Sequence, residues 1–137
     1  MAEDVMEACF EAGVLPRKVG ESSRDHVLLG AVKDSSGVAV CNPPSWHIYG
    51  SEEAAVRACP GSEHALGLGL TEAMVRYAAR YEYAWTVEDV LARRWRALFL
   101  NAREAMTMAP AVANILRDEV GQDPHLDDFI VLCRKYL

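Results

Sequence analysis

The chain has 137 residues, of which 51% are apolar and 25% charged, and its formal net charge is −6 at pH 7. This size is typical of a single domain with a core of its own. The acidic balance argues against a nucleic-acid surface, which needs clustered Lys and Arg, and no apolar run approaches the ~20 residues that cross a bilayer. We therefore expect no nucleic-acid partner and no transmembrane segment.

The N-terminal sequence MAEDVMEACFEAG carries acids where a signal peptide carries bases, so we expect no export signal and a cytoplasmic protein. The cysteines are widely spaced and include no CxxC pair: Cys9, Cys41, Cys59 and Cys133. Reduced, structural thiols are expected rather than two disulfides.

Residues 2 to 13 are predicted to form a first helix. Val5, Met6 and Cys9 make a short apolar stripe, and Gly13 followed by Pro16 ends the pattern. A helix of this length is not stable alone in water, so we expect it to dock on another surface.

Residues 16 to 50 are rich in glycine, proline and serine. Two apolar segments within them, HVLLGA (26–31) and GVAVC (37–41), fit either short strands or an extended arm. A loop of this length is uncommon in a compact domain, so we expect the arm to lie over another surface.

From residue 51 onward the pattern is helical. Ser51 and Thr71 are predicted helix caps, Glu72 and Arg76 a pair on the second of these helices, Pro110 the first turn of a further helix, and Asp123-Pro124 the start of the last. The expected fold is all-α, a multi-helix orthogonal bundle, with an irregular N-terminal arm. Residues 1–50 form the first helix and arm, and residues 51–137 form one compact helical domain.

One long amphipathic helix is predicted from Glu82 to Glu104, in the sequence EYAWTVEDVLARRWRALFLNARE. Thr86 caps it, and Asp89 pairs with Arg93. Arg94 falls inside the apolar stripe at helical spacing, where an unpaired charge costs several kcal/mol. We expect its partner to be a carboxylate of this domain; otherwise the partner surface belongs to another domain. The candidate structural or domain-interface residues are Glu82, Thr86, Asp89, Arg93 and Arg94.

No catalytic, cofactor-binding or metal-binding residues are predicted. The histidines are scattered with no HExxH or zinc-ligand spacing, and no complete glycine-rich nucleotide motif is present; Gly67-Leu68-Gly69 is interpreted as a turn. A nucleophile at Ser45 or Cys41, with His47 as its base, lacks a third group to orient that base. Trp46 and Tyr49 are interpreted as packing anchors of the arm, with an aromatic ligand platform as the alternative.

The Glu82–Arg94 segment resembles the C-terminal region of FAD-dependent (aerobic) glycerol-3-phosphate dehydrogenases and oxidases. The family pattern E-x-A-x-T-x-E-D-x-L-x-R-R is matched by Glu82, Ala84, Thr86, Glu88, Asp89, Leu91, Arg93 and Arg94. MAEDV (1–5), HVLLGA (26–31), YGSEEAAV (49–56) and the terminal LCRKYL resemble further family segments. Two positions depart from the pattern: Val27 replaces a proline of the arm, and Trp85 stands where arginine is common.

The resemblance implies a non-catalytic C-terminal domain of a flavoenzyme. The parent would oxidise sn-glycerol 3-phosphate to dihydroxyacetone phosphate with FAD, passing electrons to quinone or oxygen, at a site in domains that this sequence lacks. No cofactor is expected in this chain. The implied partners are the missing FAD and substrate domains, and the parent could be peripheral at the inner face of the membrane.

The alternative interpretation is a free-standing helical interaction or oligomerisation module. Phe99 and Leu100, which fall outside the main apolar stripe, would then serve a self-association face. A homo-oligomer is compatible with either interpretation.

Overall fold

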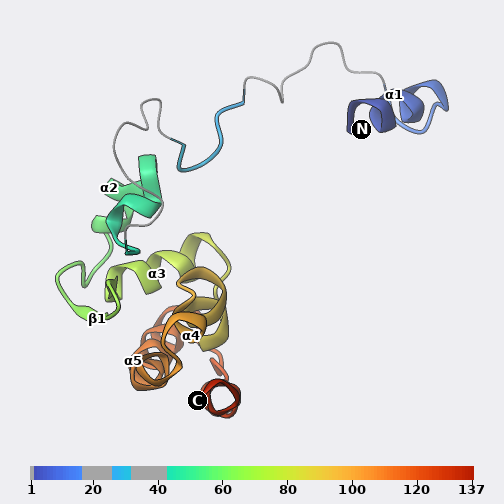
Figure 1. Cartoon of the computed structure of the whole chain (residues 1–137). Helices are drawn as coiled ribbons and strands as arrows, with labels where there is room; N and C mark the ends of the chain where they lie inside the picture. The colour runs from blue at the N-terminus through green and yellow to red at the C-terminus, as the bar shows by residue number, and fades with distance from the viewer. Residues whose placement is uncertain (1, 17–25, 32–42) are drawn as a thin grey trace.

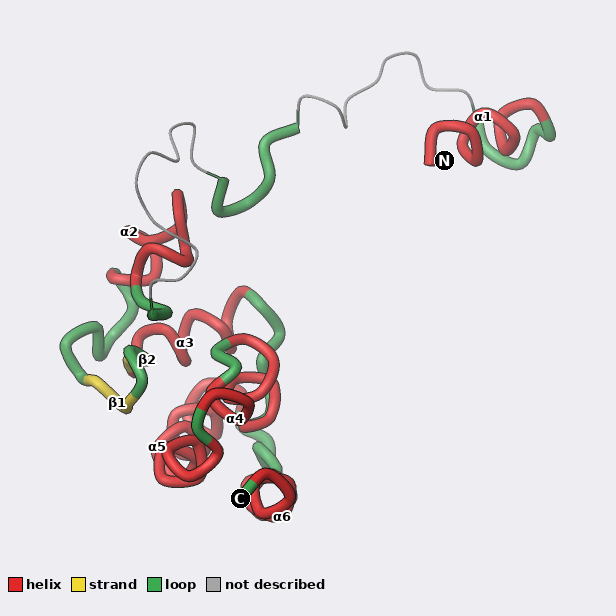
Figure 2. The backbone as a smooth tube through the Cα atoms, viewed as in Figure 1, coloured by secondary structure: helices red, strands yellow, loops and turns green. Residues whose placement is uncertain are grey.

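The computed structural model describes residues 2–16, 26–31 and 43–137. Within these ranges the chain is mainly helical, with one two-stranded hairpin, which confirms the predicted helical class. Figures 1 and 2 show the helices gathered in the C-terminal part of the chain, with the first helix apart from them. The predicted segment GVAVC (37–41) lies outside the described residues.

The first helix, α1 (Ala2–Glu11), has the predicted position and is followed by Gly13 at φ 68°. None of its residues is buried, and Figure 1 shows it well separated from the other helices. The docking that its short length requires is therefore not made within the described part of this chain.

The arm has no regular secondary structure over residues 26–28 and turns at residues 29 and 30, with no strand in the described segment 26–31. The backbone N–H of Ser51 donates to the carbonyl of Gly30 at 3.3 Å. Next comes a 3₁₀-helix, η1 (Trp46–Glu52), which is kinked internally at Gly50 and continues directly into α2 (Glu53–Arg57). Ser51 therefore lies inside η1 and does not cap α2, so that prediction was wrong; η1 also crosses the predicted domain boundary at residue 50.

A short hairpin joins α2 to α3. Strand β1 (Ala65–Gly67) pairs antiparallel with β2 (Leu70–Thr71), and α3 (Glu72–Tyr81) follows directly. Thr71 stands before the first turn of α3 as predicted, but its buried hydroxyl makes no hydrogen bond. The predicted Glu72–Arg76 pair is present, with Arg76 Nε donating to Glu72 Oε1 at 3.1 Å.

The prediction of one helix from Glu82 to Glu104 was wrong. The segment contains a loop, a helical turn that continues as the π-helix η2 (Asp89–Arg94), and the short α4 (Ala97–Leu100). Arg96, in the left-handed region at φ 58°, separates η2 from α4, and Asn101 at ψ 88° ends α4. The Arg94 side chain is consequently about one-third exposed rather than buried in an apolar stripe.

The longest helix, α5 (Ala102–Val120), begins eight residues before Pro110, so Pro110 does not open a helix as predicted. The backbone N–H of Glu104 donates to the side chain of Asn101 at 3.1 Å and caps the helix. The last helix, α6 (Leu126–Cys133), begins after Pro124 rather than at it, and the 3₁₀ turn η3 (Arg134–Tyr136) ends the chain.

The core is centred on α5, which contacts both α3 and α6. Its largest fully buried side chains come from α2 to α6, the π-helix segment and strand β2: Phe129, Leu70, Met74, Leu91, Leu98, Met108, Leu116, Val56, Val75, Val87, Val90 and Val112. Outside the core, Glu119 of α5 bridges Arg76 and Arg80 of α3 at 2.6 and 2.7 Å. Together these contacts position the helices against which residues 82–96 pack.

No helix in the described ranges is long and apolar enough to cross a membrane.

Candidate functional site

The candidate residues meet at the start of the π-helix. Thr86 Oγ1 donates to Asp89 Oδ2 at 2.8 Å, and the backbone N–H of Asp89 donates back to Thr86 Oγ1 at 3.1 Å. The same carboxylate accepts the backbone N–H of Trp85 and of Thr86. This reciprocal arrangement is a capping box, and it confirms the predicted cap at Thr86.

The Asp89 carboxylate is held in its ionised form. Partial burial raises its pKa, but hydrogen bonds from Thr86 and Trp85 and the charge of Arg93 outweigh that effect, so the pKa lies below the ordinary value. The predicted Asp89–Arg93 pair is present, with the two charged groups 3.2 Å apart. Arg93 also donates to Glu88 at 2.9 Å, and its side chain is 65% exposed.

The π-helix explains why Arg94 leaves the predicted stripe. The backbone N–H of Trp95 donates to the carbonyl of Val90 at 2.8 Å, an i→i−5 bond that places one extra residue in the turn. The residues that follow are rotated relative to a regular α-helix. Trp95 stays in the core, whereas Arg94 reaches the edge of it.

Arg94 Nε lies 3.1 Å from Glu82 Oε2, and both side chains are about one-third exposed. The expected carboxylate partner within this domain is therefore present. Tyr49 of η1 lies close to the pair: burial raises the pKa of its hydroxyl, the charge of Glu82 raises it further, and the charge of Arg94 lowers it. The pair thus joins the end of α3, the end of the π-helix and the arm.

Further contacts hold the arm beside this pair. Tyr49 packs edge-on against Tyr77 of α3 with ring centroids 5.9 Å apart, and the guanidinium of Arg57 covers the Trp46 ring at 4.1 Å. Tyr77 in turn donates to Glu52 at 3.1 Å; burial and this bond raise the pKa of Tyr77 to about 12. Trp46 and Tyr49 act as packing anchors in the described structure.

Trp95 links the π-helix to the hairpin, a contact that the sequence did not predict. Its indole N–H donates to the carbonyl of Leu68 at 2.9 Å. Leu68 and Gly69 both have positive φ, and a Cβ at Gly69 would overlap the carbonyl oxygen of Pro44. The tight turn thereby contacts Pro44 of the arm on one side and Trp95 at the end of the π-helix on the other.

The Gly67–Gly69 turn does not fit a dinucleotide. It joins two antiparallel strands, and a Cβ at Gly67 would meet Met108 and Glu104 of α5 at about 3.0 Å, so the turn is packed against protein. Among the described residues no group of His, Cys, Asp or Glu is placed to hold a metal ion. Cys41, which was considered as a nucleophile beside His47 and not predicted to be one, lies outside the described residues.

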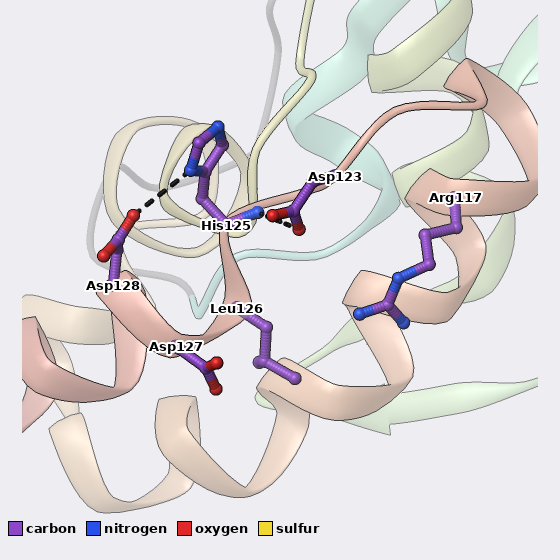
Figure 3. Close-up of a pocket in the computed structure, with 6 residues that line it drawn as sticks. All are labelled: Arg117, Asp123, His125, Leu126, Asp127 and Asp128. Carbon is purple, nitrogen blue, oxygen red and sulfur yellow. Dashed lines mark hydrogen bonds and ion pairs between the residues drawn. The ribbon is translucent and has the colours of Figure 1, made fainter.

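An open pocket of about 260 Å³ lies at the start of α6. Figure 3 shows the residues that line it: Arg117, Asp123, His125, Leu126, Asp127 and Asp128. The backbone N–H of His125 donates to Asp123, and its ring lies 3.1 Å from Asp128. These contacts stabilise the left-handed turn at His125. The pocket contains none of the candidate residues from the 82–94 segment.

Comparison with known proteins assigns the family. The family described as the C-terminal domain of alpha-glycerophosphate oxidase matches residues 46–126, which cover η1 through the start of α6. This chain belongs to that family. The matched residues include the Glu82–Arg94 pair, the Thr86–Asp89 capping box and the Trp95–Leu68 contact.

Two curated relatives match parts of the chain. Mitochondrial glycerol-3-phosphate dehydrogenase of Schizosaccharomyces pombe is 40% identical over 58 residues, which are 42% of this chain and 9% of that protein. Probable mitochondrial glycerol-3-phosphate dehydrogenase of Caenorhabditis elegans is 48% identical over 50 residues, which are 36% of this chain and 7% of that protein. The aligned region is thus less than a tenth of either relative. No solved structure matches the chain.

Proposed function

We propose that this chain serves as the C-terminal, non-catalytic domain of an FAD-dependent glycerol-3-phosphate dehydrogenase. The parent would oxidise sn-glycerol 3-phosphate to dihydroxyacetone phosphate and pass the electrons from the flavin to an acceptor. The observation that carries the proposal is the family match over residues 46–126, together with relatives named as glycerol-3-phosphate dehydrogenases.

The chemistry of the described residues supports a non-catalytic role. Hydride transfer belongs to a cofactor rather than to side chains. Among the described residues, the Gly67–Gly69 turn is packed against α5 and Pro44, and the charged groups of the 82–94 segment are used in ion pairs and a cap. FAD would therefore be held by other domains of the parent, which are also the proposed binding partners.

Arg93 is the residue proposed to reach those domains. The side chain of Arg94 forms an ion pair with Glu82 at the edge of the core. The side chain of Arg93 is 65% exposed and is held in place by ion pairs with Glu88 and Asp89. A guanidinium fixed in this way can offer its remaining N–H groups to a carboxylate of another domain. Cytoplasmic localisation, with the parent peripheral at the membrane, stays a prediction beside this proposal.

The proposal is tested by steady-state assays on the full product of the gene and on the 137-residue chain. With an artificial electron acceptor, the full product should reduce the dye only when sn-glycerol 3-phosphate is added, and the chain alone should not, even with added FAD. Dye reduction by the chain alone would contradict the non-catalytic role. A full product that contains flavin but oxidises other substrates in preference would contradict the proposed substrate.

A second comparison tests the role of Arg93. In the full product, Arg93→Glu should weaken the association of the domains, which limited proteolysis would report as faster release of the C-terminal fragment. Arg103→Glu is the matched control, because Arg103 is also exposed and lies on α5 away from the capping box. Equal cleavage rates in the two variants would exclude Arg93 as the anchor.

A further inference from the structure

An exposed aromatic and aliphatic surface lies where α4 meets the end of the chain. Phe99 and Tyr136 pack edge to face with ring centroids 5.7 Å apart, although they are 56% and 52% exposed. Leu100 and Leu137, their neighbours in sequence, are 66% and 61% exposed. These four residues, Phe99, Leu100, Tyr136 and Leu137, are called the terminal face below. Contiguous exposed apolar side chains of this kind mark interaction surfaces.

The charges around the terminal face are basic, although the protein is acidic overall. In the part of the chain that the structure describes, most arginines pair with a carboxylate: Arg57, Arg76, Arg80, Arg93 and Arg94. Arg96, Arg134 and Lys135 make no such pair in these same ranges. Arg96 precedes α4 directly, and Arg134 and Lys135 stand beside Tyr136 in η3. Asp127 and Asp128 lie at the opposite end of α6.

Helix α1 is complementary to the terminal face, because it is acidic and has an exposed apolar stripe. It carries four acidic residues and no basic one, and its sequence AEDVMEACFE places Val5, Met6 and Cys9 on one stripe. Val5 is 63% and Met6 44% exposed, and no residue of the helix is buried. Ten residues do not hold a helix in water without a docking surface.

We propose that α1 of one copy of this chain docks its Val5–Met6–Cys9 stripe on the terminal face of a second copy. The acidic residues of α1 then lie beside Arg96, Arg134 and Lys135, and the exchange is reciprocal. Reciprocal docking doubles the buried area per dimer, which matters because one ten-residue helix covers less than the 1,200–2,000 Å² typical of a stable interface. Exchange of an identical element is a known route to closed dimers.

The structure favours a second copy over the same chain as the source of α1. Figure 1 shows α1 well apart from α4 and the C-terminus, and residues 12–45 of the sequence separate α1 from η1. The inference does not depend on the proposed function, because it concerns the association of this chain with itself and is measured without substrate or flavin.

Light scattering during size-exclusion chromatography of the intact chain tests the proposal. We expect a concentration-dependent dimer, and Val5→Asp and Leu100→Asp should each raise its dissociation constant by about tenfold or more, since each places a carboxylate in the apolar contact. Tyr81→Ser is the matched control: Tyr81 is 63% exposed but belongs to α3, outside the terminal face, so the dimer should be unchanged.

Disulfide trapping tests whether the α1 that docks on the terminal face comes from a second copy or from the same chain. In a Cys41→Ser background, Leu100→Cys should oxidise with Cys9 to a product of twice the chain mass on a non-reducing gel, and Val5→Asp should abolish that product. A cross-link within one chain, a monomer at every concentration, or a dimer insensitive to both Val5→Asp and Leu100→Asp would each overturn the proposal.

Discussion

Arg94 Nε lies 3.1 Å from Glu82 Oε2, and this contact joins two segments that a regular helix would have kept apart. The π-helix creates it, because the extra residue in its turn moves Arg94 from the expected apolar stripe to the edge of the core. The ion pair closes the loop between α3 and η2, beside Tyr49 of the arm. How much the ion pair contributes to the free energy of unfolding shows whether its main role is to stabilise this domain or to form an interface.

Removing the ion pair should cost little in this chain alone. Both side chains are about one-third exposed, so Arg94→Ala is expected to lower the free energy of unfolding by at most about 1 kcal/mol. Urea denaturation measures this. A loss of several kcal/mol would show that the pair is structurally essential here, and would remove the reason to seek its main role in the larger protein.

The capping box should stabilise this chain, and its contribution should depend on pH. Thr86→Ala or Asp89→Asn is expected to cost about 1 kcal/mol at neutral pH, because the first turn of the helix loses its cap. The folded-state pKa of Asp89 is below its ordinary value, so its stabilisation is present above the unfolded pKa of about 3.9 and is lost as pH falls through the folded pKa.

Urea titrations of the wild type and Asp89→Asn across the acidic range check this prediction. The difference in the free energy of unfolding should shrink as pH falls below about 4. A difference that stays constant down to the lowest pH at which the chain folds would contradict the assigned role of the carboxylate.

Glu119 should be the most important surface charge for stability. It accepts hydrogen bonds from Arg76 and Arg80, its side chain is 10% exposed, and the Arg80 bonds in particular hold its pKa below the ordinary value. Glu119→Gln is expected to cost about 1–3 kcal/mol, the range for hydrogen bonds to charged groups. Asp118→Asn is the control, since Asp118 is exposed and should change stability by less than about 0.5 kcal/mol. Equal effects in the two variants would argue against the α3–α5 bridge.

Two glycines allow the contact between the arm and the hairpin to be measured. Gly69 and Gly121 have nearly the same backbone angle, at φ 79° and 72°, so alanine should strain both by about 1–2 kcal/mol. Only at Gly69 would the added Cβ overlap a neighbour, the carbonyl of Pro44. We expect Gly69→Ala to be the more destabilising and to increase proteolysis within residues 43–52. Identical stability of the two variants would mean that the arm does not rest on the hairpin.

Much of the fold could be predicted from the sequence because its signals are local. The end of α1 before Gly13, the cap at Thr86, and the Glu72–Arg76 and Asp89–Arg93 pairs each depend on residues a few positions apart. A carboxylate partner of Arg94 within this domain was also expected, and Glu82 provides it.

The breaks between 82 and 104 were missed because most of them have no local signal. No glycine or proline marks the left-handed Arg96, and the π-helix depends on Trp95 reaching Leu68 across the core. One signal was available: Asn101 followed three residues later by Glu104 is a helix-start pattern, and it would have shown that α5 begins there and that Pro110 lies inside it.

The most direct test of the account is anaerobic addition of sn-glycerol 3-phosphate to the purified full product of the gene while its visible absorption is recorded. We predict an oxidised flavin spectrum that bleaches on addition of this substrate, and no visible absorption in the 137-residue chain prepared with added FAD and desalted. A full product whose flavin is not reduced by sn-glycerol 3-phosphate, or an isolated chain that retains FAD, would contradict the assignment.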